Sequence, residues 1–204
     1  MSITVEAYTG GNEAAKQLEY EIYLEEGYIE ANEYGVVLEN EDYPDFIHFV
    51  ASENGVPVGS LRLVTDPKPR HESIFRLASF THFGIEDWAR ELLARADLAS
   101  VVEVGTMVIR PGHRGGKAYA ALFSKALEFC IMSGLRYAVS TVDAGFHDRL
   151  LRRGIPMRHM GEPEFYMGSE TIPVMVDISE LAQRVLAAQA AAGASAENAR
   201  AMAS

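Results

Sequence analysis

Apolar and polar residues alternate along several short stretches of the chain and recur every three or four residues along others. Alternation with β-branched residues predicts strands at 3–8, 46–66 (as two strands), 101–109 and 135–142, and two shorter ones near 155–161 and 171–179. Helical spacing predicts helices at 12–27, 85–96, about 115–133 and 146–154. This order predicts an α/β (mixed α+β) fold, with a twisted mixed sheet and helices on both faces.

Local signals mark the ends of some of these elements. Asn12 is suited to cap the first helix and Gly27 to end it. The Glu53–Gly55 stretch between two apolar runs is the strongest hairpin signal in the chain. We expect a single domain over residues 1–185 and an Ala/Ser-rich tail over 186–204. In that tail the last helix should decay into a segment that is mobile or serves only for packing.

The composition narrows the class of protein. A chain of 204 residues suits one domain with a full core. No apolar run approaches the ~20 residues of a membrane span, and the first ten residues lack the features of a signal peptide, so we expect a cytoplasmic protein. Cys130 is interpreted as a core residue, and the six histidines show no metal-ligand spacing.

Charge is divided unevenly along the chain. The net charge of −11 argues against general nucleic-acid binding. Residues 1–60 hold thirteen Asp or Glu and one base, Lys16, whereas residues 110–158 hold nine Lys or Arg against three acidic residues. Two interpretations stay open: two solvated faces, or an acidic half that attracts a cation and a basic half that attracts phosphate.

The stretch 101–130 runs from a strand through a basic turn into an Ala-rich helix. The first N–H groups of a helix lack internal partners and its dipole adds partial positive charge, so such a turn favours phosphate. The alternative is that Gly115 and Gly116 merely start the helix. The residues of this strand end and turn that we consider for binding the donor are Met107, Val108, Ile109, Arg110, His113, Arg114, Gly115, Gly116, Lys117 and Ala118.

This order of elements resembles the fold of the GCN5-related N-acyltransferases (GNAT). In that fold the central strand splays from its neighbour and the following turn takes the pyrophosphate of an acyl carrier. The family's turn pattern is matched imperfectly by "RGGKAY", which has Lys117 and Tyr119 at positions for small residues. The family's usual general acid, a tyrosine four residues before a glycine, is replaced by Leu150, four before Gly154.

Within that fold, residues 15–180 are most similar to the autoinducer (acyl-homoserine-lactone) synthases and the long-chain N-acyl amino acid synthases. The similarity lies in five segments: "YEIYLEEGY", "DYPD", "GSLRL", "VVEVGTMVI" and "LLRRGIPMRHMGEPEFYMGSETIPVMVDIS". The resemblance implies transfer of a fatty acyl group from acyl carrier protein or acyl-CoA. It implies no tightly bound cofactor.

The resemblance also implies roles for single residues. The family's paired acidic positions fall on Asp42 and Asp45, its hairpin arginine on Arg62 and its central-strand glutamate on Glu103. Tyr23 and Tyr28 occupy positions of aromatic residues that close over the amine substrate. Two expected arginines are replaced by Glu19 and Thr106, which argues against S-adenosylmethionine as substrate and against lactone formation.

The chemistry of acyl transfer suggests what these residues do. An amine attacks a thioester only as the free base, so Glu103 is a candidate proton acceptor, directly or through water. Its alternative role is to pair with Arg62. Asp42 and Asp45 either steer the ammonium form of the acceptor or belong to a solvated acidic loop. Val139, Thr141 and Val142 are candidates for the acyl pocket, with core packing as the alternative.

We therefore expect an enzyme, an amine N-acyltransferase that uses a thioester donor. Its acceptor is a primary amine, such as an amino acid or a peptide amine. The alternatives are an ordinary acetyl-CoA-dependent N-acetyltransferase and a catalytically degenerate protein that binds an acyl ligand. Acyl carrier protein is a possible partner because it is acidic and would meet the basic half of the chain.

Overall fold

In the computed structural model, which describes residues 2–38, 46–64 and 78–202, eight strands form one sheet. The strands are β1 (Ile3–Thr9), β2 (Phe46–Glu53), β3 (Val56–Val64), β4 (Val101–Ile109), β5 (Tyr137–Asp143), β6 (Arg158–His159), β7 (Glu164–Tyr166) and β8 (Ser169–Asp177). The helices are α1 (Glu13–Glu25), α2 (Ala78–Thr81), α3 (Asp87–Arg95), α4 (Lys117–Met132), α5 (Ala144–Arg152) and α6 (Ile178–Met202). Short 3₁₀ turns cover Leu98–Ser100 and Pro111–His113.

The sheet consists of two antiparallel halves that meet at one parallel pair. Its order is β1-β2-β3-β4-β5-β8-β6, with β7 paired to β8. Strands β1 to β4 are antiparallel neighbours, as are β5 and β8. Among the described strands only β4 and β5 run parallel, and their pairing covers just Val101–Val104 with Tyr137–Ser140. The two halves are therefore joined along a short seam.

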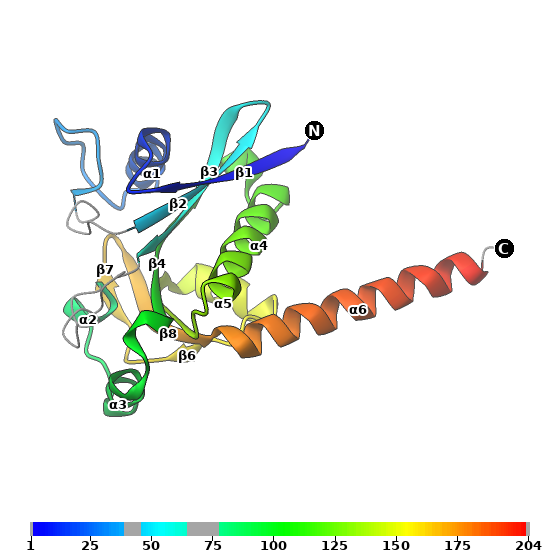
Figure 1. Cartoon of the computed structure of the whole chain (residues 1–204). Coiled ribbons are helices and arrows are strands. Elements are labelled where there is room, and N and C mark those ends of the chain that lie inside the picture. Colours follow the sequence, from blue (N-terminus) through cyan, green and yellow to red (C-terminus); the bar gives the residue numbers. More distant parts are fainter. Residues whose placement is uncertain (1, 39–45, 65–77, 203–204) are drawn as a thin grey trace.

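Helices cover both faces of this sheet, as the sequence predicted (Figure 1). On one face α4 buries Leu122 and Ala126 against Phe49 and Leu63 of β2 and β3. On the other face α1 packs against Val108 of β4. The helices α2 and α3 pack against a cluster that includes residues of β4, β5 and β8. Two apolar layers thus enclose the sheet, which satisfies the need of each amphipathic helix to bury one side.

The local signals in the sequence are confirmed. The Asn12 side chain accepts a hydrogen bond from the Ala15 N–H at 3.0 Å and so caps α1. Asn54 and Gly55, with φ of 53° and 80°, form the turn between β2 and β3. Both residues tolerate positive φ, which a two-residue hairpin turn of this type requires.

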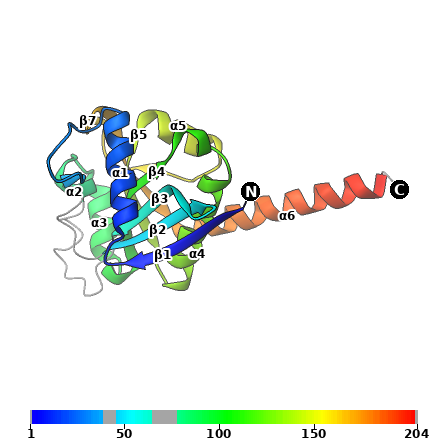
Figure 2. The same ribbon diagram turned by 90° about the horizontal axis from the view of Figure 1, so that it is seen from above.

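The C-terminal segment differs from the expectation. Instead of decaying after its first turns, α6 is helical to Met202 and runs away from the sheet (Figures 1 and 2). Alanine has the highest helix propensity and the segment contains no proline, so its composition continues a helix rather than ending one. The short strand β7, which pairs with β8, was also not predicted from the sequence.

A close backbone contact joins the loop before α3 to the turn before β7. A Cβ atom on Gly161 would lie 2.0 Å from the carbonyl oxygen of Gly84. The Glu86 N–H donates to the Met160 carbonyl at 2.7 Å, and the Glu164 carboxylate accepts from the Gly84 N–H at 3.1 Å. Position 161 therefore has no room for a side chain.

Replacing Gly161 with alanine should destabilise the protein. The new methyl group has to push two backbone segments apart, and overpacking of this kind costs about 1–3 kcal/mol or more. Urea denaturation of Gly161→Ala measures the loss. The matched control is Gly112→Ala, where an added Cβ meets no atom within 4 Å. Equal unfolding free energies for the two variants would contradict the prediction.

Candidate active site

A cavity opens where β4 and β5 separate. Their parallel pairing ends at Val104 and Ser140, although β4 continues to Ile109 and β5 to Asp143. A cavity of about 670 Å³ lies at this divergence, lined by both strand ends and by residues of α1, α4, α5, β8 and the start of α6. Ligand pockets of enzymes have this size and this mixture of apolar walls with a few polar groups.

A β-bulge at Gly105 decides which β4 side chains share a face. Arg62 of β3 pairs with Thr106 and Leu63 pairs with Val104, so Gly105 is the extra residue of β4. An extra residue shifts the alternation by one position. Glu103 and Thr106 consequently lie on the same face, three residues apart.

The bulge also makes room for a guanidinium group. A Cβ atom on Gly105 would lie 2.9 Å from Nη2 of Arg62, so the Arg62 side chain lies directly against the Gly105 backbone. The same Nη2 atom is 3.5 Å from the Thr106 hydroxyl. Arg62 is 3% exposed and lines the cavity.

Glu103 lines the cavity close to the point where the pairing of β4 with β5 ends, and it is 1% exposed. Its Oε1 atom accepts two hydrogen bonds from Ser79 of α2, one from the hydroxyl at 2.7 Å and one from the backbone N–H at 3.0 Å. A buried carboxylate needs such donors to keep its charge. Ser79 was not identified from the sequence, because no local pattern relates it to a strand 24 residues away.

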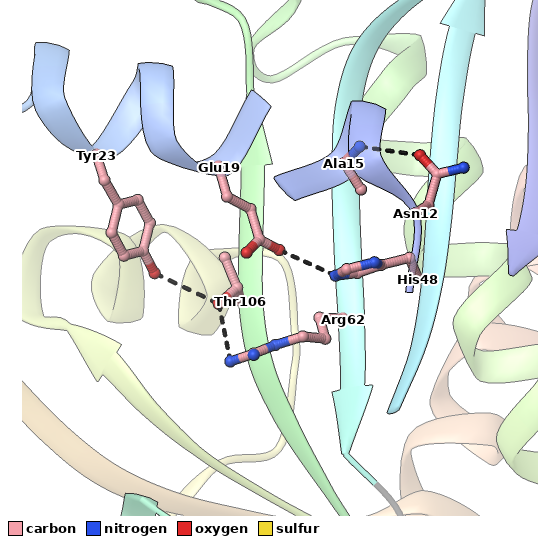
Figure 3. A network of polar contacts seen from close by, with 7 residues as sticks. All are labelled: Asn12, Ala15, Glu19, Tyr23, His48, Arg62 and Thr106. Carbon is pink, nitrogen blue, oxygen red and sulfur yellow. Dashed lines mark hydrogen bonds and ion pairs between the residues drawn. The ribbon is translucent and has the colours of Figure 1, made fainter. Parts of the chain in front are cut away.

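Polar side chains form a buried row across the sheet beneath α1 (Figure 3). His48 of β2 lies opposite Arg62 of β3, which lies opposite Thr106 of β4. From α1, Glu19 reaches His48 Nε2 at 3.5 Å and the Tyr23 hydroxyl reaches Thr106 at 3.5 Å. Burial raises the pKa of Tyr23 to about 12, so its hydroxyl keeps its proton at neutral pH.

The candidate residues for the acceptor meet in part at this end of the cavity. Tyr23, Tyr28 and Arg62 all line it. The rings of Tyr23 and Tyr28 pack edge to face with centroids 5.5 Å apart, which holds both rings in place. Asp42 and Asp45 lie outside the described residues.

The basic turn contributes only part of its predicted set to the cavity. Arg114 and Gly115 line it, together with Met107, Val108 and Ile109. Arg114 is paired with Glu26 at 2.6 Å. Arg110 is instead bound to Glu21 at 2.9 Å, and His113 lies 3.2 Å from Glu53.

The remaining residues of the turn lie outside the lining. Gly116 is the N-cap residue of α4 and has no side chain to satisfy the first N–H groups of the helix. Lys117 begins the helix and is exposed, whereas Ala118 is buried in the core against the sheet. The start of α4 keeps the geometry that favours phosphate.

Two further arginines of the cavity come from α5. Arg149 lies in the helix and Arg153 is its C-cap residue, and both line the cavity. The Arg153 guanidinium donates to the Gly115 carbonyl at 3.4 Å and lies 4.3 Å from the centre of the Tyr119 ring. From the sequence, Arg149 and Arg153 were expected, together with Arg152, only as an outer basic patch that faces the acyl carrier.

The opposite end of the cavity is apolar. It lies between α4, β8 and the first turn of α6, and its walls include Phe123, Leu127, Cys130, Val176 and Leu181. Cys130 is buried and burial raises the pKa of its thiol to about 12, which confirms it as a core residue. These walls were not predicted, because they come together only through tertiary packing.

The prediction for the acyl pocket is corrected at one residue. Thr141 and Val142 line the cavity. Val139 lies outside its lining, in the cluster with Phe83 and Leu93 beneath the sheet. Val139 lies within the paired part of β5, opposite Glu103, and is covered by that cluster, whereas Thr141 and Val142 lie beyond Ser140, where the pairing with β4 ends.

Within ranges 2–38, 46–64 and 78–202, no three or more His, Cys, Asp or Glu side chains are arranged to hold a metal ion. In the same part of the chain, no helix has the length and apolar character of a membrane span.

Solved structures with the same fold are acyltransferases. The CoA-dependent acyl-homoserine lactone synthase BjaI shares 22% identity, with a TM-score of 0.64 over 87% of this chain and 84% of its own. The AHL synthase LasI shares 12% identity, with a TM-score of 0.63 over 87% and 90%. FeeM, an N-acyl amino acid synthase from uncultured soil microbes, shares 13%, with a TM-score of 0.59 over 88% and 93%. The splayed sheet and its cavity are those of the GNAT-like acyltransferase fold.

The particular family follows from the sequence. Residues 14–177 match the family of the N-acyl amino acid synthase FeeM. None of the curated proteins matches the chain. Because the match covers most of the chain, the protein belongs to the FeeM family and is an enzyme that transfers an acyl group to an amine. The resemblance described from the sequence is thereby confirmed.

Removing the Thr106 hydroxyl should destabilise the buried row. Thr106→Val keeps the shape but takes away the atom that Tyr23 and Arg62 approach, and a buried polar group without its partner costs about 1–3 kcal/mol. Thr106→Ser keeps the hydroxyl and is the control. Urea denaturation compares the two, and a valine variant as stable as the serine variant would contradict the role of this hydroxyl.

Proposed function

We propose that this enzyme transfers a fatty acyl group from acyl carrier protein or coenzyme A to the primary amine of an amino acid or peptide. The single observation that carries the proposal is one cavity with a buried carboxylate at its polar end and a deep apolar channel at the other. An amine and a fatty acyl thioester need these two environments side by side.

The reaction has a simple balance of atoms. The neutral amine attacks the thioester carbonyl, the N–C bond forms and the C–S bond breaks. The amine loses one proton and the departing thiolate gains one. Glu103 is the proposed proton acceptor, directly or through one water, because it lines the cavity at the point where β4 leaves β5. Cleft-facing N–H groups of β4 beyond Val104 have no β5 ladder partner and are suited to bind the thioester arm.

The carrier is proposed to lie over the start of α4. Its phosphates would meet the N–H groups of that helix, with Arg114, Arg149 and Arg153 around them. BjaI is described as CoA-dependent and as bound to isopentyl-CoA. Acyl carrier protein offers the same phosphopantetheine arm on an acidic surface, so both carriers suit these arginines.

The acceptor is proposed to enter beside α1. Tyr23, Tyr28 and Arg62 are the residues for it there, with Asp42 and Asp45 as proposed attractants for its ammonium form. Glu19 and Thr106 stand where relatives that use S-adenosylmethionine are expected to carry arginine, which supports a different amine. A cytoplasmic location stays a prediction from the sequence.

Glu103→Gln tests the proposed base. Loss of a positioned proton acceptor should lower kcat by roughly 10²- to 10⁴-fold. The deficit should shrink at high pH, because more of the amine arrives already deprotonated. Acyl-amine formation is measured by mass spectrometry from pH 6 to 10, together with the melting temperature. Glu128→Gln, on the exposed side of α4, is the control. A fully active Glu103→Gln enzyme would remove the base from the mechanism.

Ala138→Phe tests the apolar channel. Ala138 lines the cavity opposite Val176, so a phenyl ring there should block the far part of a long chain. Rates with a long-chain thioester should fall roughly 10-fold or more while rates with a short-chain thioester change little, since each methylene in such a pocket is worth about 1–3 kcal/mol. Ala188→Phe on the exposed side of α6 is the control. An equal loss for both chain lengths would contradict an acyl channel here.

A further inference from the structure

Ser79 has no role in the proposed reaction so far, but it contacts the proposed proton acceptor Glu103 directly. It is 0% exposed and donates two hydrogen bonds to one oxygen of Glu103, at 2.7 Å and 3.0 Å. The hydroxyl and the N–H of the same residue thus converge on Oε1. Such convergence fixes both the rotamer and the position of the carboxylate.

Apolar anchors hold Ser79 in this place. Its neighbour Phe80 is 7% exposed and Phe83 is 5% exposed, and both pack against Val101 and Val139 beneath the sheet. Val101 precedes Glu103 by two residues on the same face of β4, and Val139 pairs with Glu103 in the parallel ladder. Ser79 and Glu103 are therefore both held in position by the same hydrophobic cluster.

We propose that Ser79 is a positioning residue that keeps Glu103 ionised and aimed at the acceptor amine. The inference rests on the proposed role of Glu103 as proton acceptor. Desolvation disfavours a buried carboxylate, whereas donors to its charged form favour it. The two donors of Ser79 favour the charged form of Glu103, which is the form that takes the proton of the attacking amine. Without the hydroxyl, the charged form is favoured less, and the carboxylate loses one of the two hydrogen bonds that Ser79 donates.

Ser79→Ala tests this role through a pH profile. At saturating acceptor, kcat near neutral pH should fall about 10-fold, the order expected for one hydrogen bond to a charged group. The acidic limb of the kcat profile should move to higher pH by about one unit, and activity should recover above it. The KM for the acyl thioester should change little, because Ser79 does not line the cavity.

Two further variants separate positioning from simple packing. Ser79→Thr keeps the hydroxyl and should restore both the rate and the position of the acidic limb. Ser60→Ala removes another fully buried serine hydroxyl, one without a hydrogen-bond partner among the described residues and outside the cavity lining. It should leave the profile unchanged. Melting temperatures of all variants report any loss of folded protein.

The combination with Glu103→Gln distinguishes the possible failures. In that background Ser79→Ala should lower kcat no further, since the serine acts through the carboxylate. If Glu103→Gln alone is fully active, the proposed base fails and the role of Ser79 falls with it. If Glu103→Gln is impaired but Ser79→Ala keeps the normal rate and acidic limb, only the inference about Ser79 is overturned. Should Ser79→Ala not fold, Ser79→Cys, with its weaker donor, should give an intermediate shift, and an unshifted limb would also overturn the inference.

Discussion

The β-bulge at Gly105 is the constraint on which the rest of the site depends. A regular strand would point Glu103 and Thr106 to opposite faces, one toward α1 and the other toward α4. With Gly105 as an extra residue, both lie on the face of α1, and the Arg62 guanidinium lies against the glycine backbone. Bulges also increase the local twist and bend of a strand. The end of the β4 and β5 pairing just before the bulge, and hence the cavity itself, is consistent with that bend.

The buried row beneath α1 explains how charged residues persist in this position. His48, Arg62 and Glu19 are each no more than 3% exposed, and a lone buried charge would cost far more than the site gains. Polar contacts within the row offset part of that cost: the Glu19 carboxylate lies 3.5 Å from His48 Nε2, and the Arg62 guanidinium lies 3.5 Å from the Thr106 hydroxyl. A carboxylate at position 19 suits a protein whose hairpin arginine is buried. An arginine at position 19 would place a second cation in this row in the place of the carboxylate.

The parts of the fold set by local chemistry were predictable from the sequence. Asn12 and the Asn54–Gly55 turn act through the adjacent backbone, so the sequence identifies them directly. The residues that were missed depend on distant parts of the chain. Ser79 meets Glu103 only because Phe80 and Phe83 anchor α2 against the sheet. Arg149 and Arg153 were expected from the sequence only as an outer basic patch for the carrier, and they line the cavity because α5 follows the splayed end of β5. Val139 was wrongly assigned to the acyl pocket. Both faces of β5 are buried, so the apolar pattern of this strand does not distinguish residues that line the pocket from residues of the core.

The cavity offers a physical reason why Leu150 stands at the position of the usual general acid. Leu150 lines the cavity and packs with Ile155, Val176 and Leu181 around its apolar end. A tyrosine hydroxyl at this position would need a hydrogen-bond partner among aliphatic side chains, which would be costly. An acetyl group does not need such a channel, whereas a long acyl chain gains stability from every methylene it buries there. The change from acid to leucine therefore fits an enzyme that holds its thioester by the acyl chain. In such an enzyme, proton transfer to the leaving sulfur falls to groups at the polar end of the cavity or to water.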